Sequence, residues 1–130
     1  MSSCIFDAAA VLAVLNGERG QEIAQPHLFG ATISAVNYSE VLKKTVEYGG
    51  SCQKMELILA KQQLDIVPFD APHASAAAEI WPESKPLGLS FADRACVSLG
   101  LMLDLPILTT DEDMTKVNVP VTFNLIRKRH

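Results

Sequence analysis

Short apolar segments alternate with longer segments of helical periodicity along the whole chain. Brief runs of apolar or β-branched residues that end at a polar residue or a proline predict strands, and the amphipathic stretches between them predict helices. The predicted strands cover residues 4–6, 31–33, 64–67, 106–109 and part of 119–125. The predicted helices cover residues 8–15, 20–27 (more weakly), 36–48, 52–63, 71–81 and 90–103, and residues 82–88 are expected to form a loop.

Strand-like runs that alternate with helices are typical of βα units and of a mainly parallel sheet. The 130 residues contain no internal repeat, low-complexity tract or linker that would divide them, and their number is close to the commonest domain size. We therefore expect one α/β domain over residues 1–130. In open sheets of this class, ligands bind beyond the carboxyl ends of the strands.

Composition and charge narrow the function classes. Hydrophobic residues make up 48% of the chain and charged residues 20%, which predicts a folded core rather than disorder. Fifteen Asp and Glu oppose eleven Lys and Arg, for a net charge of −4. That balance argues against a non-specific nucleic-acid coat protein. It is compatible with an enzyme that acts on nucleic acid through metal ions.

The sequence also lacks the features of a membrane or disulfide-bonded protein. Its longest apolar run, residues 8–15, is far shorter than the ~20 residues of a membrane helix, and the first residues lack a basic segment. Three cysteines are scattered without CxxC spacing, and the three histidines are isolated, so we expect free thiols and surface imidazoles. These features predict a cytoplasmic protein without a structural zinc site.

Acidic residues stand where the predicted strands end or where the predicted helices begin. Asp7 directly follows the first strand, and Glu40 lies about one to two turns into the helix after the second. Asp93 lies near the start of the helix 90–103. Asp111 and Asp113 follow the strand 106–109. Because the carboxyl ends of parallel strands meet at one edge of a sheet, we expect these carboxylates to converge there.

Taken singly, each acid has a purely structural explanation. Asp7 is a good N-cap, worth ~1 kcal/mol. Glu40 has the spacing for a surface ion pair with Lys44, worth ~0.3–0.5 kcal/mol, and Ser90 with Asp93 resembles a capping box. Taken together, carboxylates held ionised by helix dipoles at one edge repel one another unless cations bind. Mg²⁺ and Mn²⁺ are the divalent ions that suit oxygen ligands.

Four segments resemble, in chain order, the acidic motifs of the PIN-domain family. They are CIFDAAAV at 4–11, ISAVNYSEV at 33–41, LSFADRAC at 89–96 and ILTTDEDM at 107–114. Each motif alone is weak, whereas four in order with suitable spacing over residues 4–125 are specific. The short chain is most similar to the VapC-type toxins of bacterial toxin–antitoxin pairs.

The resemblance implies a three-layer α/β/α sandwich and an endoribonuclease that uses one or two Mg²⁺ or Mn²⁺ ions to hydrolyse RNA. Thr109 and Asn37 would contact the metal-binding acids without binding the ion themselves. The implied partners are an RNA substrate, a small antitoxin protein and a second copy of the chain in a homodimer. By motif position, the catalytic and metal-binding acids would be Asp7, Glu40, Asp93 and Asp111, with Asp113 as an additional ligand.

One departure from the family pattern leaves an alternative open. The family commonly has Ser or Thr two residues after the first Asp, and this chain has Ala9. Loss of that hydroxyl favours a catalytically weak or inactive PIN-like binding protein. A receiver-like phosphotransfer domain is the other alternative, because Asp70 follows a predicted strand and Thr109 ends one. This chain, however, lacks the adjacent acids after the first strand and the Lys after the last strand that such a domain would need.

An acidic enzyme must still hold RNA. Aromatic residues make up only 6% of the chain, which argues against an extended base-stacking platform and favours recognition of RNA shape and backbone. The basic residues considered for this contact, with a solvated surface as the alternative, are Lys43, Lys44, Lys54, Lys61, Arg127, Lys128 and Arg129.

Overall fold

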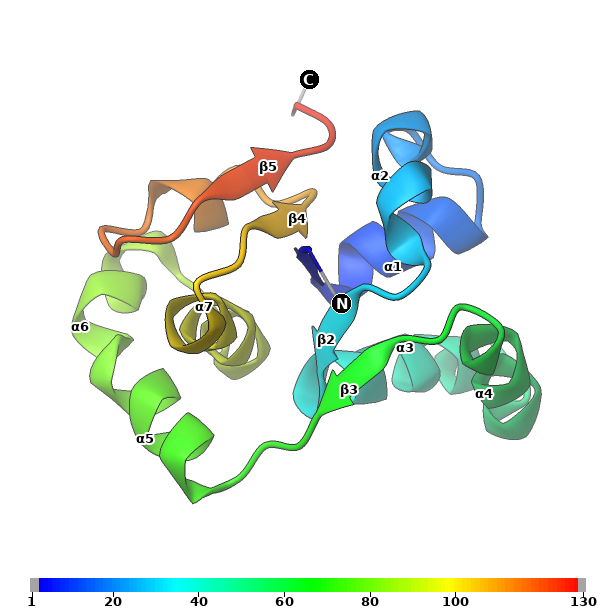
Figure 1. Ribbon diagram of the computed structural model, residues 1–130, viewed down its shortest axis with the longest axis horizontal. Coiled ribbons are helices and arrows are strands. Elements are labelled where there is room, and N and C mark those ends of the chain that lie inside the picture. The colour runs from blue at the N-terminus through cyan, green and yellow to red at the C-terminus, as the bar shows by residue number, and fades with distance from the viewer. Residues whose placement is uncertain (1–2, 129–130) are drawn as a thin grey trace.

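A single five-stranded parallel sheet forms the centre of the molecule (Figure 1), as the computed structural model of residues 3–128 shows. The strands run in the order β3-β2-β1-β4-β5, and every neighbouring pair is parallel. This confirms the parallel sheet expected from the sequence. The strands are β1 (Ile5–Phe6), β2 (Thr32–Ser34), β3 (Asp65–Val67), β4 (Ile107–Thr109) and β5 (Phe123–Leu125).

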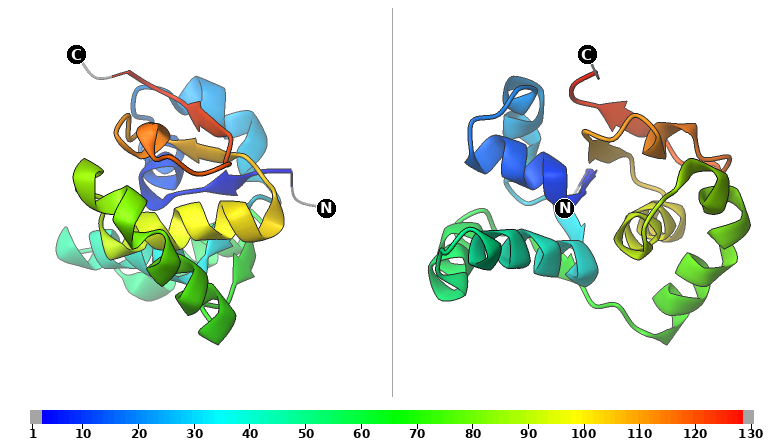
Figure 2. Two further views of the ribbon diagram at one scale, coloured as in Figure 1. Left: turned by 90° about the vertical axis from the view of Figure 1, so that its left-hand side faces the viewer. Right: turned by 180° about the vertical axis from the view of Figure 1, so that it is seen from behind.

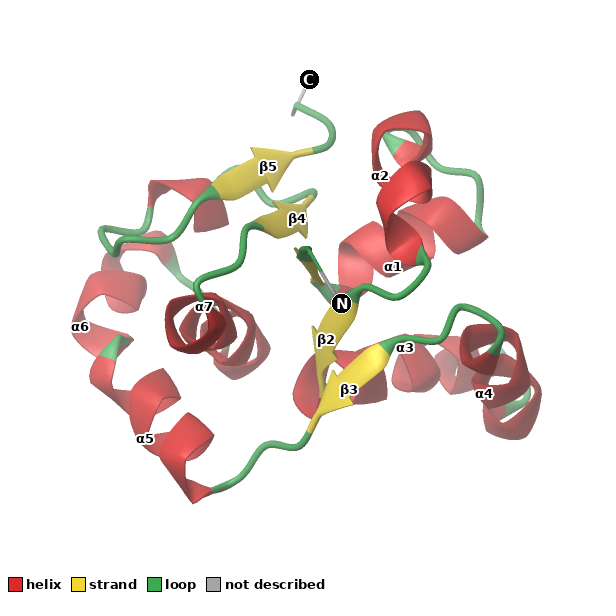
Figure 3. Cartoon of the chain, viewed as in Figure 1, coloured by secondary structure: helices red, strands yellow, loops and turns green. Residues whose placement is uncertain are grey.

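Helices cover both faces of the sheet and complete the three layers (Figures 1 and 3). Helices α5, α6 and α7 lie on one side, and α1 to α4 lie on the other, as the two further views also show (Figure 2). The helices are α1 (Ala8–Leu15), α2 (Gln21–Leu28), α3 (Ala35–Glu47), α4 (Cys52–Ala60), α5 (Ala71–Glu79), α6 (Trp81–Ser84) and α7 (Phe91–Leu103).

Alternation along the short strands divides the core into two clusters. Phe6, Ile33 and Leu108 are buried in the cluster formed with α1 and α2. Ile5 and Ile107 are buried in the other cluster, which contains the inner face of α7. Because successive strand residues point to opposite faces, the position after Phe6 points to the side of α7.

The segment 82–88 was expected as a loop, and that expectation is wrong. It contains the end of α6 and a 3₁₀ turn, Lys85–Leu87. Pro82 and Pro86 stand in the first turn of these two elements, where a missing N–H removes no intrahelical hydrogen bond. Two prolines therefore mark two short helical starts here.

His73 differs from its expected surface position. Its side chain is buried, its Nε2 lies 2.8 Å from the carbonyl oxygen of Ala95, and its ring lies 4.6 Å from that of Phe69. The alanine-rich sequence of α5 lets this helix approach α7 closely, so the imidazole fills the space between them. His27 is exposed as expected, and His130 lies outside the described residues.

The sequence predicted neither a membrane-spanning helix nor a disulfide bond. Within residues 3–128, no helix is both long enough and apolar enough to cross a membrane. The three cysteines are free thiols; Cys4 and Cys96 are buried, and Cys52 is partly exposed.

Gly20, the N-cap of α2, lies close to the backbone of Ile126, the residue that follows β5. It has a left-handed φ of +96°, and a Cβ on it would lie 2.6 Å from the backbone oxygen of Ile126. Gly88 also has a left-handed φ, +67°, but a Cβ there would meet no atom within 4 Å. A substitution at Gly88 therefore tests backbone strain alone, whereas one at Gly20 tests strain together with a steric clash.

We expect Gly20→Ala to lower the free energy of unfolding by about 2–4 kcal/mol, because strain and collision add. Gly88→Ala should cost only about 1 kcal/mol, the strain alone. Urea unfolding followed by circular dichroism measures both variants. Equal losses in the two variants would contradict the close approach at Ile126.

Candidate metal centre

Four acidic side chains from different parts of the chain line one cavity of about 290 Å³ at the carboxyl edge of the sheet. Asp7 caps α1 directly after β1, and Glu40 lies on α3, which follows β2. Asp93 is in the first turn of α7, and Asp111 follows β4. The structure thus brings together four of the five acids that the sequence singled out.

Asp113 is the fifth, and it is not among the residues that line the cavity. Its backbone N–H donates to Asp111 Oδ1 at 2.9 Å, and its Oδ1 lies 3.6 Å from Lys116 Nζ. Its expected role as an additional metal ligand therefore stays a prediction.

Asp7 is the most buried of the four acids, with 6% of its surface exposed. Its Oδ1 accepts a hydrogen bond from the N–H of Ala10 at 2.8 Å, and its Oδ2 accepts one from the hydroxyl of Thr109. The Thr109 oxygen in turn accepts the N–H of Asp111 at 2.9 Å. Thr109 thereby orients two of the cavity's acids at once, which agrees with its expected supporting role.

Each of the other three acids uses one carboxylate oxygen in a local hydrogen bond. Asp93 Oδ2 accepts the N–H of Ser90 in a capping box, and Asp111 Oδ1 accepts the N–H of Asp113. Glu40 Oε1 accepts from the side-chain amide of Asn37 at 3.1 Å. The second oxygen of each accepts no hydrogen bond from a residue in the described part of the chain. Capping and ligand binding are therefore compatible roles for these acids.

Asn37 forms the wall between α3 and α7. Its Nδ2 donates to Glu40 Oε1 and to the carbonyl oxygen of Ala92, both at 3.1 Å. Its Oδ1 is buried and has no hydrogen-bond partner among residues 3–128, although Asn37 lines the cavity. An unpartnered buried acceptor at this position fits a bound cation or an ordered water, because leaving it unsatisfied costs free energy.

Burial dominates the electrostatics of the cavity. It raises the pKa of Asp7 from 3.8 to about 7, against the hydrogen bonds from Thr109 and Ala10, and the charges of Asp93 and Asp111 raise it further. Burial also raises the pKa of Asp93, to which the charge of Asp111 adds. Burial of Asp7 therefore opposes the helix dipole that was expected to keep this carboxylate ionised, because the loss of hydration raises its pKa.

No basic side chain compensates this negative charge. The ion pairs among residues 3–128 involve Glu18, Glu47 and Asp113, and none of the four acids of the cavity. The expected pair between Glu40 and Lys44 is absent, since Lys44 Nζ lies 3.6 Å from Glu47. Lys44 nonetheless lines the cavity, a position that the i,i+4 spacing alone did not predict.

The donor set fits a hard divalent cation, because it consists of carboxylate oxygens and one amide oxygen, and no basic side chain of residues 3–128 forms an ion pair with the four acids. In the side-chain positions of this structure, no three His, Cys, Asp or Glu of residues 3–128 lie close enough together to hold one ion. A cation would therefore have to draw the carboxylates closer than they stand here.

Two further sequence features take their places around the cavity. Ala9, where the family has a hydroxyl, lines the cavity itself. Asp70, which suggested a receiver-like domain, is the exposed N-cap of α5 and is not among the cavity's lining residues.

None of the other basic candidates within residues 3–128 is among the residues that line the acidic cavity. Lys54 and Lys61 are exposed on α4 and directly after it. Arg127 Nη1 lies 3.2 Å from Glu18 Oε1, and Lys128 is held through its carbonyl oxygen by Arg19. Arg129 lies outside the described residues.

Several solved structures share this fold over nearly their whole length. A toxin–antitoxin complex from Klebsiella pneumoniae matches with 17% identity and a TM-score of 0.75, covering 98% of this chain and 100% of that one. VapBC2 from Rickettsia felis, bound to a DNA fragment from its promoter, matches with 15% identity and a TM-score of 0.71, over 93% and 96%. DNA-bound VapBC from Salmonella typhimurium matches with 12% identity and a TM-score of 0.71, over 98% and 100%.

At identities this low, these structures establish the fold, and they confirm the resemblance to VapC-type proteins at that level. No curated protein matches the sequence. The family model described as "PIN domain" matches residues 4–120, which include all four acids of the cavity. The chain therefore belongs to the PIN-domain family.

Proposed function

We propose that this protein is a metal-dependent endoribonuclease that hydrolyses RNA phosphodiester bonds, and that it is the toxin of a type II toxin–antitoxin pair. The observation that carries the proposal is the single cavity lined by four acids and paired with no basic side chain of the described chain. Nuclease activity is typical of the PIN-domain family to which the chain belongs.

Asp7, Glu40, Asp93 and Asp111 would hold one or two Mg²⁺ or Mn²⁺ ions. When bound, such an ion lowers the pKa of water and neutralises charge on an attacked phosphate. The side chains supply positioning: Thr109 and the N–H of Ala10 hold both oxygens of Asp7 in place before any ligand arrives. Asp7 is thus fixed in advance, and the movement that would draw the carboxylates to an ion is left to the other acids.

The rim of the cavity supplies further groups. Asn37 Oδ1 is a free acceptor that can hold a water proton at the site. Lys44, which lines the same cavity, can contact a phosphate oxygen of the substrate. A nucleic-acid backbone would thus meet one cation of the protein next to the acids.

The same comparison supports one proposed partner. Structures with this fold include a toxin–antitoxin complex, and we propose that a small antitoxin binds this chain. The homodimer is proposed from the resemblance to VapC-type toxins alone. We propose that the protein acts in the cytoplasm, because the proposed substrate is RNA.

A catalytically weak or inactive PIN-like binding protein is the second candidate. Ala9 favours it, since the residue lines the cavity at the point where the family carries a hydroxyl. Cleavage by the purified wild-type protein distinguishes the two candidates.

We expect Asp93→Asn to abolish Mg²⁺- or Mn²⁺-dependent cleavage of RNA while the domain stays folded, because the amide keeps the capping geometry and removes a charged ligand. Incubation of the purified protein with total cellular RNA, followed by mapping of new ends, measures this. Asp104→Asn is the matched control: Asp104 lies at the opposite end of α7 in a left-handed conformation that Asn tolerates.

Cleavage by Asp93→Asn at the wild-type rate would refute the metal-centre assignment. Absence of cleavage by the wild type, together with no thermal stabilisation by Mn²⁺, would instead favour the binding protein.

The raised pKa of Asp7 generates a second prediction, for the protein in chelator. The folded state binds this proton more tightly than the unfolded chain does, so stability falls as the pH rises from 3.8 to about 7. The contribution is about 1.4 kcal/mol per unit of pKa shift. Asp7→Asn should remove this component and be more stable than the wild type above pH 7.

Urea unfolding at several pH values measures the difference between the two proteins. Asp70→Asn, which alters the capping residue of α5 outside the cavity, is the control for a lost N-cap carboxylate. Mn²⁺ should raise the stability of the wild type at neutral pH and not that of Asp7→Asn, because cation and proton compete for one carboxylate. Equal pH profiles for both proteins would contradict the buried, uncompensated state of Asp7.

A further inference from the structure

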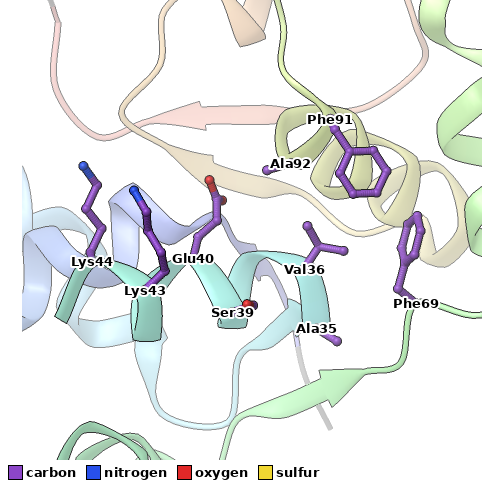
Figure 4. Close-up of a pocket in the computed structure, with 9 residues that line it drawn as sticks. All are labelled: Ala35, Val36, Ser39, Glu40, Lys43, Lys44, Phe69, Phe91 and Ala92. Carbon is purple, nitrogen blue, oxygen red and sulfur yellow. The ribbon is translucent and has the colours of Figure 1, made fainter. Parts of the chain in front are cut away.

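A second cavity, of about 610 Å³, adjoins the acidic one. Both are lined by Glu40 and Lys44, so they are continuous along the first turns of α3. Figure 4 shows Phe69 and Phe91 at one end of this groove, Lys43 and Lys44 at the other, and Glu40 between them. We call it the Phe91 groove; its remaining lining residues are Ala35, Val36, Ser39 and Ala92.

Contacts between aromatic rings and with a guanidinium group fix the aromatic end of the groove. The rings of Phe69 and Phe91 meet edge to face at 5.3 Å, and Phe69 also contacts the buried ring of His73 at 4.6 Å. The guanidinium of Arg94 lies 5.7 Å from the centre of the Phe91 ring. Phe91 is nevertheless 51% exposed and lines the groove. Its ring is thus an ordered apolar surface open to a ligand.

The other end of the groove carries two lysines. Lys43 and Lys44 both approach the one carboxylate of Glu47, at 3.2 and 3.6 Å, so two ammonium groups share a single anion. Both lysines are exposed and line the groove. Neither lysine is paired with Glu40 in the described chain, so each ammonium group can also contact an anionic ligand such as a phosphate.

The groove therefore pairs a flat apolar surface with cations beside a candidate cleavage site, which is the chemistry of a nucleotide. Its volume lies within the ~300–1,000 Å³ of small-ligand sites. Aromatic rings bind bases of single strands by stacking, independently of base identity. One aromatic pair is a local subsite and agrees with the low aromatic content, which speaks only against an extended platform.

We propose that the Phe91 groove holds one base of single-stranded RNA beside the cleaved phosphodiester, stacked on Phe91, with Lys43 and Lys44 on the backbone phosphates. The assignment rests on the proposed nuclease function, since the acidic cavity fixes which bond is next to that base.

The test measures binding of a fluorescent single-stranded RNA of about ten nucleotides by anisotropy. All proteins carry Asp93→Asn, so that the strand stays intact in Mg²⁺. Phe91→Ala should weaken binding about tenfold, the effect of losing one stacked base. Phe91→Leu should weaken it similarly, whereas Phe91→Trp should retain it. Phe29→Ala, at a phenylalanine 64% exposed after α2 and outside the groove, should bind as tightly as its parent.

A strand with abasic sugars in its central positions separates stacking from other effects. It should bind the parent protein about tenfold more weakly than the normal strand and bind Phe91→Ala equally to it, since a removed contact cannot be lost twice. Because Phe91 is half-exposed, circular dichroism should show every variant folded.

Two results would overturn the proposal: unchanged RNA affinity of Phe91→Ala, or an equal penalty of the abasic strand in both proteins. Either would assign the groove to a protein partner instead. Cleavage by the protein without Asp93→Asn is scored separately, so failure of the groove leaves the nuclease proposal intact. A protein that binds RNA through Phe91 but never cleaves it would refute the nuclease function alone.

Discussion

The hydrogen bond from Thr109 to Asp7 joins two strand ends that are 102 residues apart in sequence. It exists because β1 and β4 are parallel neighbours in a register that pairs Phe6 with Leu108, so the residues that follow stand side by side. Both then point to the side of α7, opposite to Phe6 and Leu108. Asp93 and the buried Cys96 of α7 lie on that same side, and the acidic cavity depends on this one register.

Bringing carboxylates together in this way lowers stability, and local hydrogen bonds at each acid offset part of that loss. Asp93 completes the capping box of α7, and Asp111 Oδ1 accepts the N–H of Asp113, so each acid stabilises the segment that carries its charge. Asp7 caps α1 as well, yet its burial outweighs its hydrogen bonds. These hydrogen bonds offset part of the cost, and the four acids remain without an ion pair to a basic side chain of the described chain, so a cation is attracted to the cavity.

Helix α3 connects the acidic cavity to the surface that surrounds it. One side of its first turns contributes Asn37 and Glu40 to the cavity, and the next turn contributes Lys43 and Lys44 to the Phe91 groove. Asn37 ties this helix to the start of α7 through the carbonyl oxygen of Ala92, and Phe91 is the residue before it. The position of Glu40 and the two lysines relative to the ring of Phe91 therefore depends on the contact between α3 and α7. A ligand that spans both cavities would read all three groups together.

Local sequence determined most of the elements and the identity of the acids. Apolar runs ending in Asp7, Ser34 and Thr109 marked three strands, and capping residues marked the helix starts, because these signals act within a few residues of each other. The two prolines at 82 and 86 were misread, since the same residue can end one helix or begin another.

Only the tertiary structure decided what the acids and their neighbours do. Burial of Asp7, the placement of His73 between α5 and α7, and the pairing of Lys44 with Glu47 instead of Glu40 all depend on residues distant in sequence or on side-chain geometry. Spacing along the chain shows which groups could meet, whereas hydration and distance, which set charge and pKa, arise only when the strands and helices pack together.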